Sequence, residues 1–442
     1  MSKSTDEMKK QIKPASIWRK PWLYLGILVV LLVAAFGLYQ VPAIQNRVDS
    51  LYSKIYYRLN PPTENVFDPS QQGTLSAHVV ATLTAMAPTP TTPPPATAAS
   101  PTQEGAPTEM PTPTFTPFPV PAAYALDGIG LEYQTFNNCG PANLSMNITY
   151  WGWTTNQSIT EDALKTHPDD RNVMLSEMKV YAEANTDLKG LIRFGGDMEV
   201  IKRLLSGGFP VLLERGHTDP EDGWMGHYSI ITAYDDATRT VTIPDTLLGM
   251  MTMSYDDLLL DWAHFDGIYL VVYPPEKEQE VLSLLGEHAD PAKNLRLTLE
   301  QIEERAAGLT GRELFFALYS KGSILVEMQD YLSASQAYDQ AFAVYGQLDP
   351  GQRPWRILWY QVGAYPAYYY TGRFEDVVTL AQQTLDNSRQ PKSLPETWYW
   401  AGKGAAALGD NTKAEEYLRG ALQFYPNWDL ATEELARIDV TP

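Results

Sequence analysis

The feature that most constrains the fold of this 442-residue chain is a stretch without periodic hydrophobicity, residues 61–121. Pro, Thr and Ala dominate this stretch, and it contains no Lys or Arg. Such a composition cannot bury enough apolar surface to offset the entropy lost when the chain is ordered. We therefore expect a disordered, extended linker, which limits compact structure to the segments on either side of it.

Before the linker lies an apolar run, residues 22–40, with the sequence WLYLGILVVLLVAAFGLYQ. About 20 apolar residues suffice for a helix to cross a bilayer. Basic residues gather before this run: Lys9, Lys10, Lys13, Arg19 and Lys20. By the positive-inside rule, the pattern predicts a single-pass transmembrane anchor in the cell membrane, with residues 1–21 in the cytoplasm and the rest of the chain extracytoplasmic. A cleaved signal peptide is the alternative.

Residues 41–60 follow the run and carry apolar residues at alternating spacings of three and four. This spacing predicts a juxtamembrane helix. Its apolar stripe has two interpretations. The stripe lies on the lipid surface, or residues 41–59 pair two chains into a homodimer as a short coiled coil.

Charge and cysteine content exclude several functions. The net charge of −20 disfavours nucleic acid, because binding phosphates requires a basic face. Cys139 is the single cysteine, so the chain has no intrachain disulfide and no zinc site made of cysteines. We expect no cofactor and no metal. A metal site made of His217, Asp219 and His227 is an alternative, but these residues belong to a loop that we expect to be flexible.

Residues 122–275 have the pattern of one α+β domain. Apolar spacing and flanking glycines predict helices over 140–151 and 197–206. Alternating apolar residues predict four strands, in the segments FPVLLE (209–214), HYSIITAY (227–234), TVTI (240–243) and GIYLVVY (267–273). Residues 276–308 are expected to form a helical bridge to the C-terminal region.

Residues 309–442 repeat a pattern of helical pairs. In the first pair, Gly322 is expected to let two helices approach closely and Tyr338 to fill the gap beside them. Gly402 and Ala414 occupy the small-residue positions of the last pair, and a looser unit lies between. This spacing resembles three tetratricopeptide repeats, which implies an all-α solenoid that recruits a protein partner or a substrate.

The single cysteine has the surroundings of a nucleophile. A nucleophilic thiol needs a lowered pKa, a base, a group that orients the base, and a site for the oxyanion. Gly140 permits a tight turn and Pro141 suits the first turn of a helix, so Cys139 is expected at a helix N-terminus. There the helix dipole and the unpaired N–H groups favour the thiolate. Taken alone, a single cysteine is more often an ordinary structural residue than a nucleophile.

The base is expected to be His227. It begins the strand predicted over 227–234, directly after a glycine-containing loop, and a side chain at the mouth of a strand is well placed to point into a cleft. His217 lies ten residues earlier in a polar loop and is the main competitor for this role.

Asp245 and Gln134 complete the predicted site. If residues 235–237 form a three-residue hairpin loop, His227 lies directly opposite Asp245, and the carboxylate holds the imidazole tautomer. A four-residue loop would place the two side chains on opposite faces. Gln134 lies five residues before Cys139, and its side-chain N–H and the Cys139 backbone N–H are expected to receive the oxyanion.

The order Gln, Cys, His, Asp is that of papain-like cysteine peptidases. The segments YQTFNNCGPANLSMNITYWGW and GHYSIITAYDDATRTVTIPDT more closely resemble the C39-like peptidase domain, which is related to the bacteriocin-leader peptidases, and the resemblance covers residues 124–275. It implies a papain-like fold, a peptide or protein substrate and a bacterial source. It also implies that Cys139 is the nucleophile, His227 the general base, Asp245 its orienting group and Gln134 part of the oxyanion hole.

These features together predict a membrane-anchored, extracytoplasmic cysteine peptidase that cleaves peptide bonds through a thioester on Cys139. Two alternatives stay open. In one, the domain has lost turnover and binds peptides or assembles a complex together with the repeats. In the other, the same papain-like fold is an amidase or a transamidase that acts on cell-wall peptides.

Overall fold

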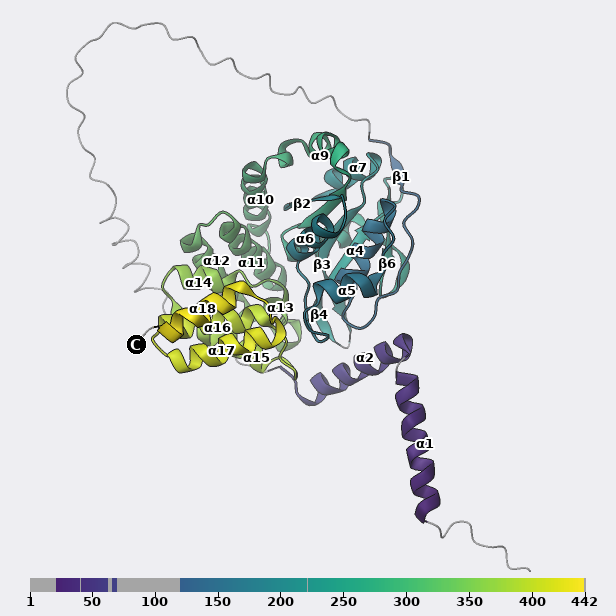
Figure 1. Cartoon of the computed structure of the whole chain (residues 1–442). Coiled ribbons are helices and arrows are strands. Elements are labelled where there is room, and N and C mark those ends of the chain that lie inside the picture. The colour runs from purple at the N-terminus through teal and green to yellow at the C-terminus, as the bar shows by residue number, and fades with distance from the viewer. Residues whose placement is uncertain (1–20, 40, 63–65, 70–119, 221, 441–442) are drawn as a thin grey trace, which may run out of the picture. The chain divides into compact units, whose positions relative to one another are not determined.

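The structure is a computed structural model that describes residues 21–39, 41–62, 66–69, 120–220 and 222–440 (Figure 1). Residues 1–20 of the predicted cytoplasmic segment and residues 70–119 of the predicted linker lie outside this description. The chain divides into two units, residues 1–53 and residues 54–442.

The first unit contains helix α1 (Pro21–Tyr39) and the beginning of helix α2 (Pro42–Leu59). Across the residues described, no helix combines the length and the apolar character needed to cross a membrane. The predicted single-pass anchor over 22–40 is therefore wrong, and with it the cell-membrane localisation, the cytoplasmic N-terminus and the extracytoplasmic placement of the domains. The helix expected over 41–60 is present as α2, and the pairing of residues 41–59 into a homodimer stays a prediction.

The second unit begins its α+β domain at residue 120, with two four-stranded antiparallel sheets. One sheet has the order β2-β8-β3-β4 and the other β1-β5-β6-β7. Three of the predicted strand segments overlap β3, β6 and β8, but the single strand predicted over 227–234 is wrong, because this segment is divided between β4 and β5, which belong to different sheets; β1, β2 and β7 were not predicted. The strands are β1 (Ala123–Ala125), β2 (Lys189–Arg193), β3 (Val211–Asp219), β4 (Gly223–Ile231), β5 (Ala233–Asp235), β6 (Thr240–Asp245), β7 (Gly249–Ser254) and β8 (Tyr269–Tyr273).

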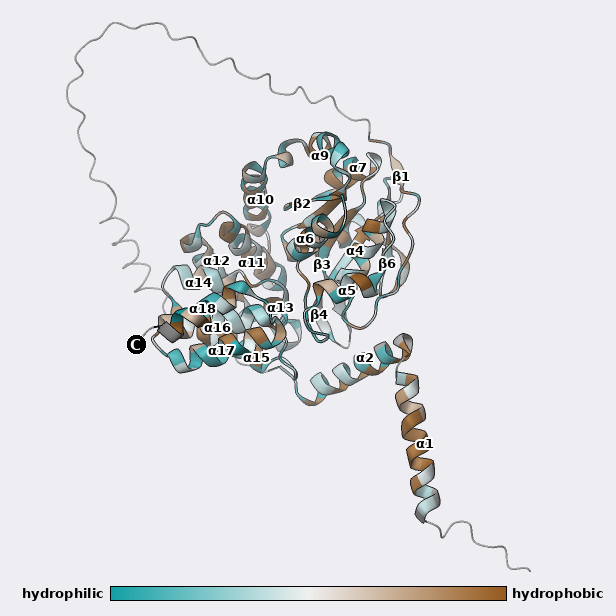
Figure 2. Cartoon of the chain, viewed as in Figure 1, coloured by the Kyte–Doolittle hydropathy of each residue, from teal (hydrophilic) through white to brown (hydrophobic). Residues whose placement is uncertain are grey.

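The first sheet separates two hydrophobic cores, because successive side chains of a strand point to opposite faces. Leu212 belongs to the core shared with α4 and α6, whereas the next residue, Leu213, belongs to the core shared with α7 and the second sheet. Figure 2 shows the hydrophobic character of these central strands. The helices of the domain are α4 (Cys139–Tyr150), α5 (Gln157–Leu164), α6 (Leu175–Asn185), α7 (Met198–Ser206) and α8 (Tyr255–Trp262).

The C-terminal region is helical. Two helices bridge to it, and three pairs of consecutive helices follow at the positions predicted from the repeat pattern, with the short α13 before the second pair. An extra helix, α18, comes last. Their bounds are α9 (Glu278–Leu285), α10 (Pro291–Ala306), α11 (Gly311–Glu327), α12 (Tyr331–Gln347), α13 (Ile357–Tyr360), α14 (Ala364–Tyr370), α15 (Phe374–Asp386), α16 (Pro395–Ala407), α17 (Asn411–Phe424) and α18 (Asp429–Val440).

Glycines let the helices of a pair approach closely. A Cβ atom added at Gly322 of α11 would lie 2.7 Å from the ring of Tyr338 in α12, and one added at Gly402 of α16 would lie 2.7 Å from the side chain of Leu418 in α17. These contacts match the roles that the repeat pattern predicted for Gly322 and Tyr338. The assignment to the tetratricopeptide family stays a prediction.

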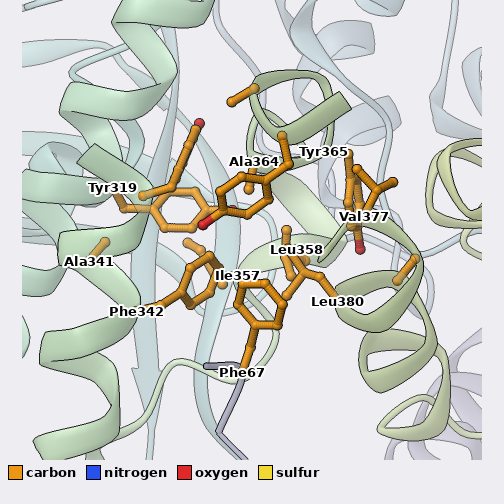
Figure 3. Close-up of a cluster of buried hydrophobic side chains, with 14 of the residues drawn as sticks. Phe67, Tyr319, Ala341, Phe342, Ile357, Leu358, Ala364, Tyr365, Val377 and Leu380 are labelled. Carbon is orange, nitrogen blue, oxygen red and sulfur yellow. The ribbon is translucent and has the colours of Figure 1, made fainter. Parts of the chain in front are cut away.

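The core of the helical region also holds a residue from the predicted linker. Phe67 is 4% exposed, and its ring centroid lies 5.0 Å from that of Phe342 and 5.8 Å from that of Tyr368 (Figure 3). The prediction that residues 61–121 are disordered throughout is therefore wrong at 66–69. A single aromatic residue in a polar segment is ordered here by an apolar site that a distant part of the chain provides.

The helical region packs directly on the α+β domain. Trp224 of β4 stacks on Phe265, with ring centroids 5.6 Å apart, and lies 5.2 Å from the ring of Phe316 in α11. Arg356, just before α13, donates a hydrogen bond of 3.3 Å to the carbonyl of Trp224. Tyr360 of α13 packs beside the same tryptophan. The helices are thereby held against the start of β4 at Trp224, three residues before His227, which lies in the middle of the strand and not at its beginning as predicted.

Candidate active site

Cys139 is the first residue of α4, as predicted. A Cβ atom added at Gly140 would lie 2.6 Å from Met178 Cε and 3.4 Å from the ring of Tyr228, so glycine lets α4 begin this close to β4. The Asn143 side chain joins the helix to the strand, because its Nδ2 donates to the carbonyls of Cys139 at 2.9 Å and Tyr228 at 3.0 Å. The half-buried thiol is thereby held beside the residue that follows His227.

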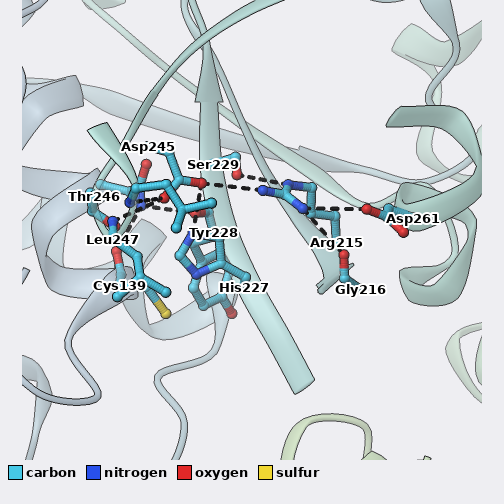
Figure 4. A network of polar contacts seen from close by, with 12 residues as sticks. Cys139, Arg215, Gly216, His227, Tyr228, Ser229, Asp245, Thr246, Leu247 and Asp261 are labelled. Atoms are coloured by element: carbon cyan, nitrogen blue, oxygen red, sulfur yellow. Dashed lines mark hydrogen bonds and ion pairs between the residues drawn. The ribbon is translucent and has the colours of Figure 1, made fainter. Parts of the chain in front are cut away.

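His227 lies between the thiol and Asp245. The imidazole is 5% exposed and is hydrogen-bonded to the Cys139 thiol. Its Nε2 lies 3.0 Å from Asp245 Oδ2 (Figure 4). Because Nε2 faces the carboxylate, Nδ1 is the ring nitrogen left for the thiol. The three side chains come from α4, β4 and the end of β6.

Asp245 is fully buried and every contact recorded for its carboxylate is with a donor. Oδ1 accepts the backbone N–H groups of Leu247 and Leu248, both at 2.9 Å. Oδ2 accepts from His227 and, at 3.2 Å, from Nη2 of Arg215. Burial alone would raise the pKa of Asp245, but the hydrogen bond and charge of His227 and the two backbone N–H groups outweigh burial and lower it. The carboxylate is therefore ionised at neutral pH.

His227 and Asp245 are in contact, but not across one hairpin as predicted. Asp235 pairs with Thr240, so the hairpin loop spans four residues, 236–239, and the three-residue loop predicted over 235–237 is wrong. The pairing also does not run on to His227, because the chain leaves β4 at Ile231 and enters the other sheet as β5. Asp245 reaches the imidazole from the second sheet rather than across one hairpin.

The electrostatics of the pair favour a thiolate and an imidazolium. Burial opposes a charged thiol, but the hydrogen bond and charge of His227 and the backbone N–H groups of Tyr228 and Gly140 lower the pKa of Cys139. Burial likewise opposes a charged imidazole, but the hydrogen bonds and charges of Asp245 and Cys139 raise the pKa of His227 to about 9. The negative thiolate and the positive imidazolium therefore stabilise each other.

Gln134 lies beside the same loop as Asp245. Its backbone N–H donates to the carbonyl of Thr246 at 2.9 Å, and the Thr246 hydroxyl donates to its Oε1 at 2.7 Å. The amide is therefore tied to the residue that follows Asp245. Its part in an oxyanion hole stays a prediction.

Arg215 is a residue of this network that the sequence analysis missed. It is 1% exposed and lies directly opposite His227 in the pairing of β3 and β4. Its guanidinium contacts Asp245 at 3.2 Å, Asp261 at 3.4 Å and the Ser229 hydroxyl at 3.0 Å (Figure 4). The signal that would have found it is the strand FPVLLE: extended to residue 219, this strand continues from its apolar residues directly into the charged pair Glu214 and Arg215.

His217, the competitor for the role of base, lies near His227 but is not the histidine that contacts the thiol. Its ring centroid lies 5.9 Å from that of His227, and burial, together with the charges of His227 and Arg215, lowers its pKa. The thiol hydrogen-bonds to His227. Within the part of the chain that the structure describes, no three His, Cys, Asp or Glu side chains are arranged to hold a metal ion, and this applies to His217, Asp219 and His227.

Comparison with known proteins supports a peptidase-type domain. Residues 125–273 match the model of the Peptidase_C39 like family. Two crystal structures have a similar fold over 34% of this chain: a C39-like peptidase from Bacillus anthracis (14% identity, 96% of its chain covered, TM-score 0.28) and a double-glycine-motif protease of an AMS/PCAT transporter bound to its leader peptide (17% identity, 94% covered, TM-score 0.26). No curated protein is significantly similar to the chain.

Proposed function

We propose that the C39-like domain is an active cysteine peptidase. The thiolate of Cys139 attacks the carbonyl carbon of a peptide bond, and the oxyanion that forms is stabilised by the Cys139 backbone N–H and the Gln134 side-chain amide. The imidazolium of His227 gives its Nδ1 proton to the leaving amine, and a thioester remains on Cys139. Water then attacks the thioester with neutral His227 as the base, which releases the carboxylic acid and restores the thiol.

One observation carries this proposal: the continuous set of contacts from Cys139 through His227 to Asp245 at the start of α4. An ordinary structural cysteine needs neither a hydrogen-bonded imidazole nor a buried carboxylate behind that imidazole. The opposite pKa shifts of Cys139 and His227 add to this argument, because the lowered pKa of the thiol favours the thiolate and the raised pKa of the imidazole favours the imidazolium.

The test is the rate at which iodoacetamide alkylates Cys139 at pH 7 in the full chain. We expect fast labelling that falls steeply in His227→Ala and in Asp245→Asn. His217→Ala is the matched control, because it removes a neighbouring histidine that is not bonded to the thiol, and it should label at nearly the wild-type rate. Slow labelling of the wild type that does not change in His227→Ala would reject the proposal.

A second measurement separates an active peptidase from a binding module that has lost turnover. An active enzyme should hydrolyse peptides from a random library and should lose this activity in Cys139→Ala. A fast-labelling protein that binds peptides but leaves them uncut would favour the scaffold alternative. Transfer of the acyl group to an added amine instead of water would favour the transamidase.

The helical region is proposed to guide the substrate. This is supported by its position against Trp224 and by Tyr360, whose ring would lie 2.9 Å from a Cβ atom added at Gly226, the residue before His227. Deleting residues 309–442 would expose a large apolar surface, so point variants test this role better than truncation.

A further inference from the structure

A cavity of about 520 Å³ lies between the α+β domain and the helical region. The α+β domain contributes Glu214 and Ile268 to its wall, and the helices contribute Glu327, Tyr360 and Val362. Its wall is mostly apolar, but three carboxyl groups face it: those of Glu214, Asp266 and Glu327. The function proposed above does not use this space.

The wall of the cavity interacts with Cys139. Glu214 and Tyr360 both line it, and both interact electrostatically with Cys139. Glu214 also lies opposite Tyr228 in the pairing of β3 and β4 and accepts a 3.0 Å hydrogen bond from the Tyr228 hydroxyl, while the backbone N–H of Tyr228 donates to the Cys139 sulfur. Because Asn143 joins the carbonyls of Tyr228 and Cys139, hydrogen bonds connect Glu214 to the start of α4.

Two of the carboxyl groups are buried, and each has one oxygen without a hydrogen-bond partner in the described part of the chain. Glu214 is 7% exposed and Asp266 is 8% exposed. Glu214 Oε1 and Asp266 Oδ1 find no hydrogen-bond partner among the residues that the structure describes. A buried polar atom without a partner is costly, so such atoms mark either a strained position or a missing ligand. Both atoms belong to residues that line the same cavity, which favours a shared ligand.

The nearby cationic side chain that lines the cavity does not supply that partner. Arg193 directs its guanidinium to the carbonyls of Ile192, His288 and Ala289. Burial raises the pKa of Asp266 to about 7 and raises the pKa of Glu214 well above its usual range. Burial therefore favours the protonated form of both carboxyl groups. A bound cation would favour their ionised forms.

We propose that this cavity is a substrate subsite that receives a cationic nitrogen of the peptide, with Glu214 and Asp266 as its hydrogen-bond acceptors. The apolar wall, which includes Ile268 and Val362, surrounds the carbon stem of a lysine or arginine side chain, and the carboxyl groups bind its charged end. This inference rests on the proposed peptidase function and adds its substrate class: peptides with a basic group close to the cleaved bond.

The experiment uses pairs of peptidyl acyloxymethyl ketones, which alkylate active-site thiols and carry either lysine or the uncharged, similarly shaped norleucine at each of three positions before the electrophile. The second-order rate of Cys139 labelling is measured in the full chain. We expect the lysine probe to react about tenfold faster or more than its norleucine partner at one position, as expected for a charge-assisted hydrogen bond in a buried site. Equal rates at all three positions would overturn the proposal.

Two substitutions locate the preference in the cavity. Glu214→Gln keeps an acceptor for the Tyr228 hydroxyl, and Asp266→Asn keeps a residue that tolerates the left-handed backbone found there, with φ 59°. Each should reduce the lysine preference, measured as the ratio of the lysine rate to the norleucine rate in the same variant. Glu280→Gln removes the same charge from an exposed site on α9 and should keep the full preference. A preference that survives in both cavity variants would overturn the assignment to Glu214 and Asp266.

Two further measurements identify the source of the cation and separate the subsite from the peptidase function. Free and N-acetylated probes show whether the cation is a side chain or the peptide N-terminus; both outcomes support a cationic subsite, and only the source differs. Iodoacetamide, which needs no subsite, reports the thiol alone. If iodoacetamide reacts slowly and indifferently to His227→Ala, the peptidase function fails. If it reacts fast but lysine and norleucine probes react equally, the subsite alone fails.

Discussion

Two buried arginines, one in each half of the larger unit, form networks with aspartates that differ in a useful way. In the helical region, Arg373 contacts both oxygens of Asp339 at 2.8 and 2.9 Å and Asp376 at 2.7 Å, and it stacks on the ring of Tyr368. In the α+β domain, Arg215 contacts its aspartates at the longer distances given above, and it shares one of them, Asp245, with His227.

The difference separates a structural network from a reactive one. The bonds of Arg373 are short and bidentate, and they join α12 to the loop before α15, so the network can hold helices together without exchanging partners. The carboxylate of Asp245 has its shorter side-chain contact with His227, at 3.0 Å, and Arg215 stands behind it at 3.2 Å. An aspartate held in this way is fixed in place but remains available to the imidazole. The four predictions below test this contrast.

The largest effect is expected at Asp245. Asp245→Asn keeps the size of the side chain but removes the charge that stabilises the imidazolium and orients its tautomer. We expect the rate of peptide hydrolysis to fall on the order of 10³-fold or more, as when an aspartate of this kind is replaced in other triads. Urea unfolding should show that the variant is folded at the assay temperature; a folded variant with near-wild-type rates would contradict the role of Asp245.

The second effect is one of stability, at Arg373. Arg373→Met leaves Asp339 and Asp376 buried without their partner, which we expect to lower the free energy of unfolding by about 3–5 kcal/mol. The measurement is urea denaturation, with Lys413→Met as the control, because the Lys413–Asp410 pair is exposed and worth about 0–1 kcal/mol. The labelling rate of the folded fraction should not change. A large loss of that rate would mean that this network also serves the site.

A smaller change in stability is expected at Arg215. In Arg215→Met, Asp245 keeps the bonds from His227, Leu247 and Leu248, so we expect a loss of about 1–3 kcal/mol, the range for hydrogen bonds to charged groups. His227 then has less competition for the carboxylate, and its pKa should rise. A pH profile of hydrolysis that moves its alkaline limb upward would agree with this; a downward movement would contradict it.

The last effect is the pH dependence of the wild type. The pKa of His227 is raised to about 9, so the stability contributed by its charged form is fully present below its unfolded-state pKa of about 6.5 and is lost as pH rises through about 9. Hydrolysis should fall over the same range, because the leaving amine loses its proton donor. Urea midpoints and hydrolysis rates between pH 6 and 10 test both; in His227→Ala the loss of stability across pH 9 should be absent.

Much of the candidate site could be read from local sequence because each of its principal groups has a local signal. Cys139 precedes a glycine and a proline that begin α4, His227 lies in a strand with alternating apolar residues, and Asp245 ends the next long strand. These signals depend on backbone preferences within a few residues. The roles proposed for Gln134, Cys139, His227 and Asp245 could therefore be assigned without knowledge of the fold.

The remaining parts depend on contacts between segments far apart in the chain. The prediction placed His227 and Asp245 in one hairpin, whereas they meet across two sheets, and no local pattern specifies where β4 leaves its sheet. Arg215 is aimed at Asp245 only because β3 pairs with β4 in one register. Glu214, one residue earlier, therefore points to the opposite face and towards the cavity that the helices close. A shift of one residue in this pairing would exchange the two side chains, so which of them supports the imidazole follows from strand register and domain packing.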